Sequence, residues 1–176
     1  MNNTLISVDI FDNPLGIISK EEAHKKGILH RAFSVFVYHS GRMLIQKRAK
    51  NKYHSGGLLS NTCCSHPRGQ NLIEEASDRL FEETGVRAKN LKEIFSFTYF
   101  TKFSEELFEY EYDHVLICDY EGAFFPNKDE VEELKWITFN ELKKEVLSHP
   151  QKFTTWFLIA LPKVLEYIQQ NEQKDM

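Results

Sequence analysis

The sequence contains no long apolar run. Its longest, Trp156 to Leu161, is far shorter than the roughly 20 residues that a membrane-spanning helix needs. The first residues, Met1 to Asp9, show neither the basic segment nor the apolar segment of a secretory signal peptide. We therefore expect a soluble, cytoplasmic protein with no membrane partner.

Cysteine and positive charge are also scarce. The three cysteines are an odd number and include the adjacent Cys63 and Cys64, so they imply no disulfide framework and favour a reducing compartment. Lys plus Arg is 22 and Asp plus Glu is 26, for a net charge of −4, which argues against a nucleic-acid partner. What remains is an ordinary globular composition, 41% apolar in 176 residues, which predicts a single domain over residues 1–176.

Alternating and β-rich segments predict a series of strands along the chain. They lie at residues 4–11, 32–38, 42–46, 58–64, 94–103, 108–118 and 134–137. The second and third of these join in a hairpin at residues 39–41.

Helices are predicted in the middle and at the end of the chain. The first spans 72–83, with Asn71 and Glu74 as a capping box, Gly85 as a stop, and an apolar stripe of Leu72, Ile73, Ala76 and Leu80. The second runs to about Leu147, with Thr138 and Glu141 as its cap, and the last begins near Thr154, where Pro162 kinks or divides it. This order of elements predicts an α+β fold, a mixed β-sheet sandwich flanked by helices.

Two short motifs carry candidate chemistry. Cys64 and His66 are two residues apart, as are Glu109 and Glu111, so in strands each pair shares a face. The pairs can form opposite walls of a pocket, while Cys63 points away and packs as a small apolar residue. A thiol, an imidazole and two carboxylates suit metal-assisted proton transfer. The alternatives are that both cysteines only pack, and that the glutamates form the solvated face of an edge strand.

Two further histidines, His24 and His30, flank a predicted turn at residues 25–27. Together with His66, Glu109 and Glu111 they form a set that suits a divalent transition ion or Mg²⁺. The alternative is that these histidines are structural or exposed.

The remaining candidates are four cations and a tryptophan. Phosphate oxygens pair well with Lys and Arg, and the candidate residues are Lys20, Arg48, Lys52 and Arg79. The alternative is exposed charge, with Glu75, Arg79 and Glu83 as a ladder along one helix face. Trp156 is either a core anchor or a ring that faces a cationic intermediate.

With these residues placed, the chain resembles the type I isopentenyl-diphosphate isomerases of the Nudix superfamily. The resemblance runs from Lys20 to Trp156. Its motifs are Leu-His-Arg-Ala-Phe-Ser-Val-Phe at 29–36, Asn-Thr-Cys-Cys-Ser-His-Pro at 61–67, Glu-Tyr-Glu-Tyr-Asp at 109–113 and Thr-Trp-Phe at 155–157. It implies a Nudix-like fold and the interconversion of isopentenyl and dimethylallyl diphosphate, so the partner is a small prenyl diphosphate. We expect a monomer or a weak dimer.

The resemblance also implies a role for each candidate residue. The ligands of an Mn²⁺, Mg²⁺ or Zn²⁺ ion would be His24, His30, His66, Glu109 and Glu111. Cys64 resembles the catalytic cysteine and Glu111 the acid/base carboxylate, with Tyr99 assisting proton transfer and Trp156 facing the carbocation. The implied diphosphate-binding residues are Lys20, Arg48, Lys52 and Arg79, with Glu83 as a ligand of a diphosphate-bound Mg²⁺.

The chain departs from the Nudix hydrolase signature, G-x5-E-x7-R-E-U-x-E-E-x-G-U, where U is apolar. Anchored at Gly85, the chain has Asp78 for the Arg, Arg79 for the following Glu, Cys64 for the first Gly and Gln70 for the first Glu. This incomplete set of carboxylates predicts phosphate binding without hydrolysis. Two rivals stay open: a Nudix hydrolase acting on a nucleoside or other diphosphate, and a non-catalytic domain that binds a diphosphate.

Overall fold

The computed structural model describes residues 3–69 and 71–172, so the Gln70 position of the hydrolase signature lies outside the described residues. The described strands are β1 (Thr4–Val8), β2 (Pro14–Ser19), β3 (His30–His39), β4 (Arg42–Arg48), β5 (Leu59–Ser60), β6 (Cys63–Ser65), β7 (Lys92–Ser104), β8 (Leu107–Asp119) and β9 (Val131–Thr138). The helices are α1 (Lys20–Lys26), α2 (Leu72–Thr84), α3 (Phe139–Ser148), a 3₁₀ turn (Pro150–Lys152) and α4 (Thr155–Glu172).

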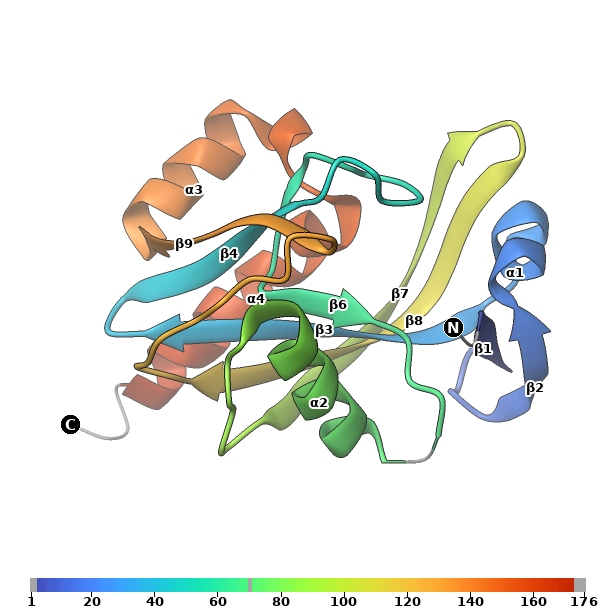
Figure 1. Cartoon of the computed structure of the whole chain (residues 1–176), viewed down its shortest axis with the longest axis horizontal. Helices are drawn as coiled ribbons and strands as arrows, with labels where there is room; N and C mark the ends of the chain where they lie inside the picture. The colour runs from blue at the N-terminus through green and yellow to red at the C-terminus, as the bar shows by residue number, and fades with distance from the viewer. Residues whose placement is uncertain (1–2, 70, 173–176) are drawn as a thin grey trace.

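Strand β3 is the centre of one mixed sheet (Figure 1). It pairs antiparallel with β4 and β6, and parallel with β8. Strand β7 extends the sheet beyond β8, and β9 extends it beyond β4. The hairpin of β1 and β2 attaches at the start of β3. Because β6 and β8 flank β3, segments far apart in sequence place their side chains over the same strand.

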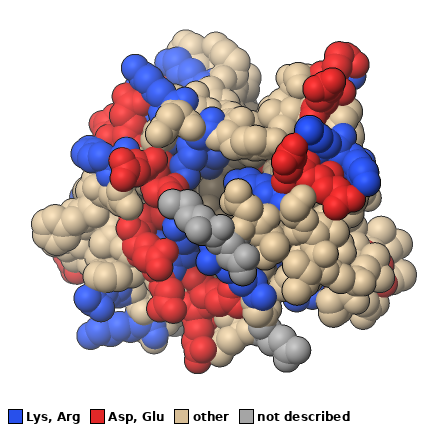
Figure 2. All heavy atoms as spheres, turned by 45° about the vertical axis from the view of Figure 1, so that its right-hand side comes forward, with Lys and Arg blue, Asp and Glu red and all other residues tan. Residues whose placement is uncertain are grey.

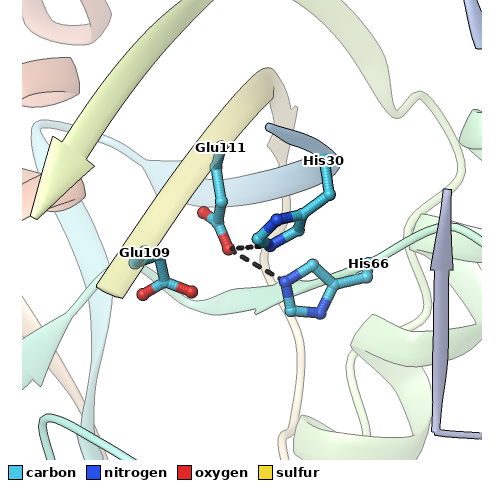
Figure 3. A group of neighbouring side chains, drawn as sticks. All are labelled: His30, His66, Glu109 and Glu111. Atoms are coloured by element: carbon cyan, nitrogen blue, oxygen red, sulfur yellow. Dashed lines mark hydrogen bonds and ion pairs between the residues drawn. The ribbon is translucent and has the colours of Figure 1, made fainter. Parts of the chain in front are cut away.

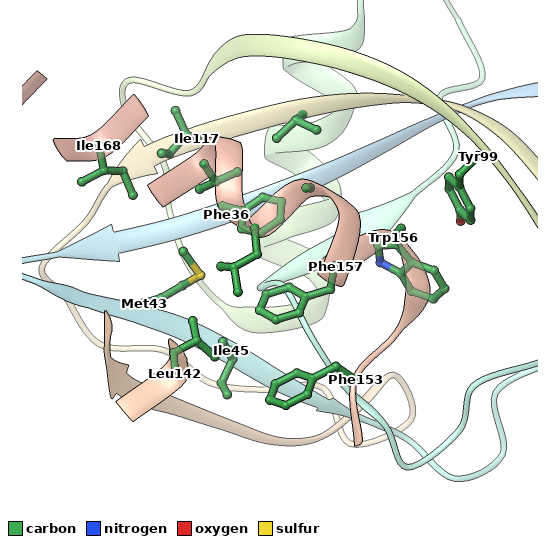
Figure 4. Close-up of a cluster of buried hydrophobic side chains, with 14 residues drawn as sticks. Phe36, Met43, Ile45, Tyr99, Ile117, Leu142, Phe153, Trp156, Phe157 and Ile168 are labelled. Atoms are coloured by element: carbon green, nitrogen blue, oxygen red, sulfur yellow. The ribbon is translucent and has the colours of Figure 1, made fainter. Parts of the chain in front are cut away.

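The sheet buries both of its faces, each against a different helix. Alternation along β3 sends Phe33, Val35 and Val37 toward α2, and Phe36 toward α4. Figure 4 shows the cluster on the α4 side, where Trp156 lies at the edge nearest Tyr99. This arrangement, with helices on both faces of a mixed sheet, confirms the predicted α+β fold.

The N-terminal strand is shorter than predicted. It ends at Val8, because the Asp9 carboxylate accepts the backbone N–H groups of Phe11 and Asn13 and so forms a local turn. Asp12 follows in the left-handed region with φ of 67°. The chain then returns as β2, which was not predicted.

The predicted strand at 58–64 is two short strands, β5 and β6. Asn61 and Thr62 separate them, and both are buried. The Asn61 amide donates to the Val35 carbonyl, and the Thr62 hydroxyl donates to the Leu44 carbonyl. These side chains replace ladder bonds, so the backbone changes direction just before Cys63 without leaving those carbonyls unpaired.

The turn predicted at residues 25–27 ends a helix, α1, that was not predicted. Ser19 caps its start, and Gly27 ends it with φ of 62°, where a residue without a Cβ is favoured. The helix is seven residues long, too short for its apolar periodicity to be recognised. Its consequence for the site is that His24 lies inside a helix, completely buried.

Helix α2 begins and ends close to where it was predicted, and Gly85 stops it with φ of 74°. Asn71 accepts the Glu74 N–H at 3.3 Å, but among the described residues Glu74 returns no bond, so only half of the capping box forms. Ile73 is 37% exposed, and the apolar stripe rests on its other members.

Pro162 does not divide α4, which continues through it to Glu172. The proline lies on the exposed side of the helix, and the opposite side carries buried apolar residues such as Phe157, Leu161 and Val164. Burial of those side chains outweighs the cost of a proline in a helix, about 3 kcal/mol. The capping box of Thr138 and Glu141 at the start of α3 is confirmed. No helix in residues 3–69 and 71–172 has both the length and the apolar character needed to cross a membrane.

Candidate active site

Three candidate residues form a row across the sheet. In the strand register, His30 on β3 is paired with Glu111 on β8, and Glu111 is paired with Tyr99 on β7. Paired residues share a face of the sheet, so the three side chains lie next to one another. His66, which follows β6, reaches the same place from the other side of β3 (Figure 3).

Glu111 is the most heavily contacted of these groups. His66 Nε2 lies 2.9 Å and His30 Nε2 lies 3.6 Å from its Oε1, and the Tyr99 hydroxyl donates to Oε2 at 2.6 Å. Burial would raise the pKa of Glu111, but the neighbouring His30 and His66 imidazoles outweigh it and hold that pKa well below the usual range. Glu111 is therefore a buried carboxylate that stays ionised.

Four candidate ligands converge closely enough to hold one ion. Each of His30, His66, Glu109 and Glu111 offers a ligand atom, and these atoms all lie within 4.8 Å of one another. Among the described residues, His30 Nε2 is buried without a hydrogen-bond partner, and Glu109 Oε2 forms no aligned hydrogen bond, although His54 Nε2 lies 2.9 Å from it. Buried polar atoms are almost always paired, so the unpaired imidazole nitrogen beside two carboxylates suits a bound cation. Two imidazoles with two carboxylates suit a divalent transition ion or Mg²⁺.

His24, the fifth expected ligand, does not join this group of four. Its Nε2 lies 3.3 Å from Glu109 Oε1, while its Nδ1 bonds the Lys20 carbonyl at 2.6 Å. The second possible ligand group consists of His24, Glu109 and an unpredicted residue, His54. Glu109 is therefore a member of both possible ligand groups.

The two adjacent cysteines face opposite sides of the sheet, as alternation predicts. Cys63 is fully buried in the core against α2, whereas Cys64 lines the cavity. The Arg48 guanidinium donates to Cys64 Sγ at 3.3 Å. Burial nevertheless raises the pKa of Cys64 to about 12, so the thiol keeps its proton at neutral pH. Cys64 packs against the core on the α4 side and also reaches the cavity, whereas Cys63 only packs.

The predicted site residues come together around one cavity, which takes in all of them except His24 and His30. The cavity is open to solvent on one side, and its empty space amounts to about 570 Å³ when that open part is counted. The cations Lys20, Arg48, Lys52 and Arg79 line it, and Figure 2 shows Lys and Arg side chains around a hollow in this face. Burial lowers the pKa of Lys20, because the ammonium group loses water without gaining a full anionic partner.

Arg79 pairs with three carboxylates, and its Nη1 lies 3.3 Å from Oε2 of the exposed Glu82. Its Nη2 lies 2.8 Å from Glu83 Oε1 and 3.1 Å from Oε1 of Glu130, which also pairs with Lys52. Glu83 is only 3% exposed, and burial raises its pKa. Glu75 instead binds the backbone N–H groups of residues 68 and 69. The alternative of an exposed ladder along this helix is therefore wrong.

Trp156 is both a core residue and a wall of the cavity. It is 3% exposed, and its indole N–H donates to Asn61 at 3.1 Å. The Arg48 guanidinium lies 5.1 Å from the centre of its ring, and the Tyr99 ring lies 6.3 Å away. Trp156 can therefore anchor the core and also present its ring to the cavity.

Comparison with known proteins decides the family. The NUDIX domain family matches residues 28–157. A protein of Aromatoleum aromaticum named isopentenyl-diphosphate Delta-isomerase 2 is 44% identical, over 94% of this chain and 88% of that one. A protein of the same name from Photorhabdus laumondii is 45% identical, over 89% of each chain. The chain belongs to the isopentenyl-diphosphate Delta-isomerases of the Nudix superfamily.

Solved structures agree on the Nudix fold. A MutT NUDIX hydrolase from Burkholderia pseudomallei matches with a TM-score of 0.62 and 19% identity, covering 77% of this chain and 98% of that one. A protein from Deinococcus radiodurans matches with a TM-score of 0.66, also at 19% identity, covering 83% and 90%. At such low identity the likeness extends to the fold alone.

Sequence reasoning missed two groups at the site, the half-buried His54 and the buried Asp113. His54 was passed over, although it lies in the same loop as Lys52; its contact with Glu109 bridges 55 positions of sequence, which local spacing does not reveal. Asp113 continues the face of Glu109 and Glu111 by two residues, so the alternation itself could have found it. Asp113 is buried and bonds Ser34, and burial, together with the nearby Glu111, raises its pKa well above the usual range.

The raised thiol pKa predicts slow alkylation. Because thiolate is the reacting form, the rate of iodoacetamide labelling at Cys64 should rise about tenfold per pH unit from pH 7 to 10, without a plateau. An ordinary thiol with a pKa of about 8.5 levels off above pH 9 or so. Fragmentation of the labelled peptide by tandem mass spectrometry distinguishes Cys64 from the adjacent Cys63, and peptide mapping separates both from Cys118; burial also raises the pKa values of Cys63 and Cys118. A plateau for Cys64 near pH 9 contradicts the prediction.

Proposed function

We propose that this protein interconverts isopentenyl diphosphate and dimethylallyl diphosphate by proton addition and removal at Cys64 and Glu111. The observation that carries the proposal is the pairing, in one cavity, of a thiol that keeps its proton with a carboxylate that stays ionised. Strand β3 runs between the strands that carry them. One proton donor and one proton acceptor are thus available on two sides of a bound substrate.

The reaction needs such a pair because an unactivated alkene is a very weak base. A positioned acid must protonate it, and a base must then remove a proton from the neighbouring carbon. The tertiary cation formed in between needs shelter from water. The buried Trp156 ring, which stabilises positive charge over its face, lies on the wall of the cavity and supports that role. Tyr99, bonded to Glu111, would assist the proton transfer on that side.

The metal centre would be built from His30, His66, Glu109 and Glu111, with His24 against Glu109. A bound Mn²⁺, Mg²⁺ or Zn²⁺ would supply Lewis-acid polarisation of the Glu111 carboxyl group. The protein's own contribution is to hold the carboxylate in place: the Tyr99 hydroxyl bonds Oε2, while Oε1 faces His30 and His66. These contacts fix the orientation of the Glu111 carboxylate relative to the cavity.

The diphosphate group would lie among Lys20, Arg48, Lys52 and Arg79. Charge-assisted bonds from these groups are stronger than neutral ones, and holding the diphosphate fixes the alkene relative to Cys64 and Glu111. Glu83, buried beside Arg79, would be a ligand of the Mg²⁺ that accompanies the diphosphate. The hydrolase signature offers carboxylates where this chain has Asp78 and Arg79, and the cation of Arg79 favours binding over hydrolysis.

The direct test is incubation with isopentenyl diphosphate and Mg²⁺, followed by chromatography of the products. We expect dimethylallyl diphosphate with no release of phosphate. Release of phosphate would identify a hydrolase, and unchanged substrate with measurable binding would identify a non-catalytic diphosphate-binding domain.

Metal removal should stop the reaction. Dialysis of the protein against a strong chelator is expected to reduce turnover to background. Added Mn²⁺ should restore turnover, because the histidine and glutamate ligands then bind a cation again. Metal analysis by mass spectrometry should find one tightly bound ion per chain before dialysis. The assignment would be contradicted by two results together. The metal-free protein would have to show full turnover with Mg²⁺ alone, and metal analysis would have to show that no Mg²⁺ is bound at these ligands.

A further inference from the structure

We propose that His54 is a positioning residue of the metal centre, which holds the Glu109 carboxylate by the oxygen that faces away from His24. The inference rests on the metal centre proposed above. His24 Nε2 lies 3.3 Å from Glu109 Oε1, and His54 Nε2 lies 2.9 Å from Oε2. Two imidazoles thus stand at the two ends of one buried carboxylate, and only the first forms an aligned hydrogen bond.

Glu109 needs a partner on that side. Its side chain is 2% exposed, so water does not satisfy its second oxygen, and a buried carboxylate oxygen without a partner is costly. When an ion takes one oxygen of a ligating carboxylate, the other is usually hydrogen-bonded by a neighbouring group, which fixes the ligand's orientation. Among the described residues, His54 is the ion-pair partner of Oε2.

The ring of His54 is held in place for this role. It stacks on Phe103 with centroids 4.5 Å apart and planes at 17°, and it meets the Trp156 ring edge-on at 5.9 Å. Its side chain is 9% exposed. These two contacts restrict the orientation of the imidazole and keep Nε2 beside the Glu109 carboxylate.

The backbone of His54 connects the same loop to the catalytic thiol. Arg48 donates through Nη2 to the His54 carbonyl and through Nη1 to Cys64 Sγ, both at 3.3 Å. Lys52, a proposed diphosphate ligand, lies two residues before His54. The loop therefore meets the metal centre through its histidine and the diphosphate region through its lysine.

Substitutions at His54 separate its hydrogen-bond donor from its ring. His54→Gln places an amide nitrogen where Nε2 lies, His54→Asn is one methylene too short to reach Glu109, and His54→Phe keeps the stacking but has no donor. The full-length variants are freed of metal and titrated with Mn²⁺, and free Mn²⁺ is followed by electron paramagnetic resonance. The dissociation constant should rise about 10- to 100-fold for the Asn and Phe variants, the usual effect of losing such a partner. The Gln variant should stay close to wild type.

The control is His39→Phe, the same change at a histidine that pairs with Asp119 away from the site; it should leave Mn²⁺ binding unchanged. Thermal unfolding checks that each variant is folded, and the Gln and Asn pair remains decisive if the Phe variant is not. Wild-type affinity in the Asn variant overturns the role of His54, as does equal weakening of the Gln and Asn variants. No Mn²⁺ binding by the wild type would instead overturn the metal centre itself.

Discussion

Cys64→Ala should nearly abolish turnover, while Cys63→Ala should leave it close to wild type. General acid–base groups typically contribute on the order of 10²–10⁴-fold, and the loss here should reach at least that range, because an alkene has no heteroatom for water to protonate instead. Cys64 lines the cavity beside Arg48. Cys63 lies in the core against α2, so its replacement should affect stability rather than rate.

Glu111→Gln should be as damaging as Cys64→Ala, because an amide neither accepts a proton nor carries the charge that His30 and His66 stabilise. The three variants are best compared in deuterated water, with label in the product followed by mass spectrometry. Cys64→Ser should keep a little activity, since a hydroxyl can relay a proton. If Cys63→Ala were the inactive variant, or if Cys64→Ala incorporated label at the wild-type rate, the assignment of the thiol would be wrong.

The second large effect should come from reversing the charge of Arg79. Arg79→Glu would place a third carboxylate beside Glu83 and Glu130, which now share the guanidinium at 2.8 and 3.1 Å. Like charges this close repel one another and an incoming diphosphate, so we expect isomerisation to be abolished. Arg79→Ala removes only the attraction, and should raise KM because the lost bonds exist in ground and transition states alike.

Steady-state kinetics on both variants checks this, with thermal unfolding to show that α2 remains folded. Arg87→Glu is the matched control, since Arg87 is an exposed arginine that follows the same helix and stacks on Phe81; its KM should not change. An Arg79→Ala variant with unchanged KM and a lower kcat would contradict a binding role. An active Arg79→Glu variant would show that the diphosphate lies elsewhere.

Local patterns in the sequence determined a good part of this structure. Period-2 alternation predicted that Cys64 would face the pocket and that Cys63 would pack in the core, and it placed Glu109 and Glu111 on one face. Capping and stop signals predicted α2 and α3, because the bonds that end a helix lie within a few residues of its terminus. The same local rules failed where a segment was short, as in α1, or where side chains replaced ladder bonds, as at Asn61 and Thr62.

Only the tertiary structure decided which of these local features meet. His30, Glu111 and Tyr99 form a row because three strands pair in one register, and register depends on the packing of both faces of the sheet rather than on any one segment. The same packing placed His24 against Glu109 rather than within the group of four, and brought His54 to the second oxygen of that carboxylate. The spacing of residues along the chain reveals which side chains share a face of a strand or helix. Contacts between distant segments depend instead on the simultaneous burial of many side chains.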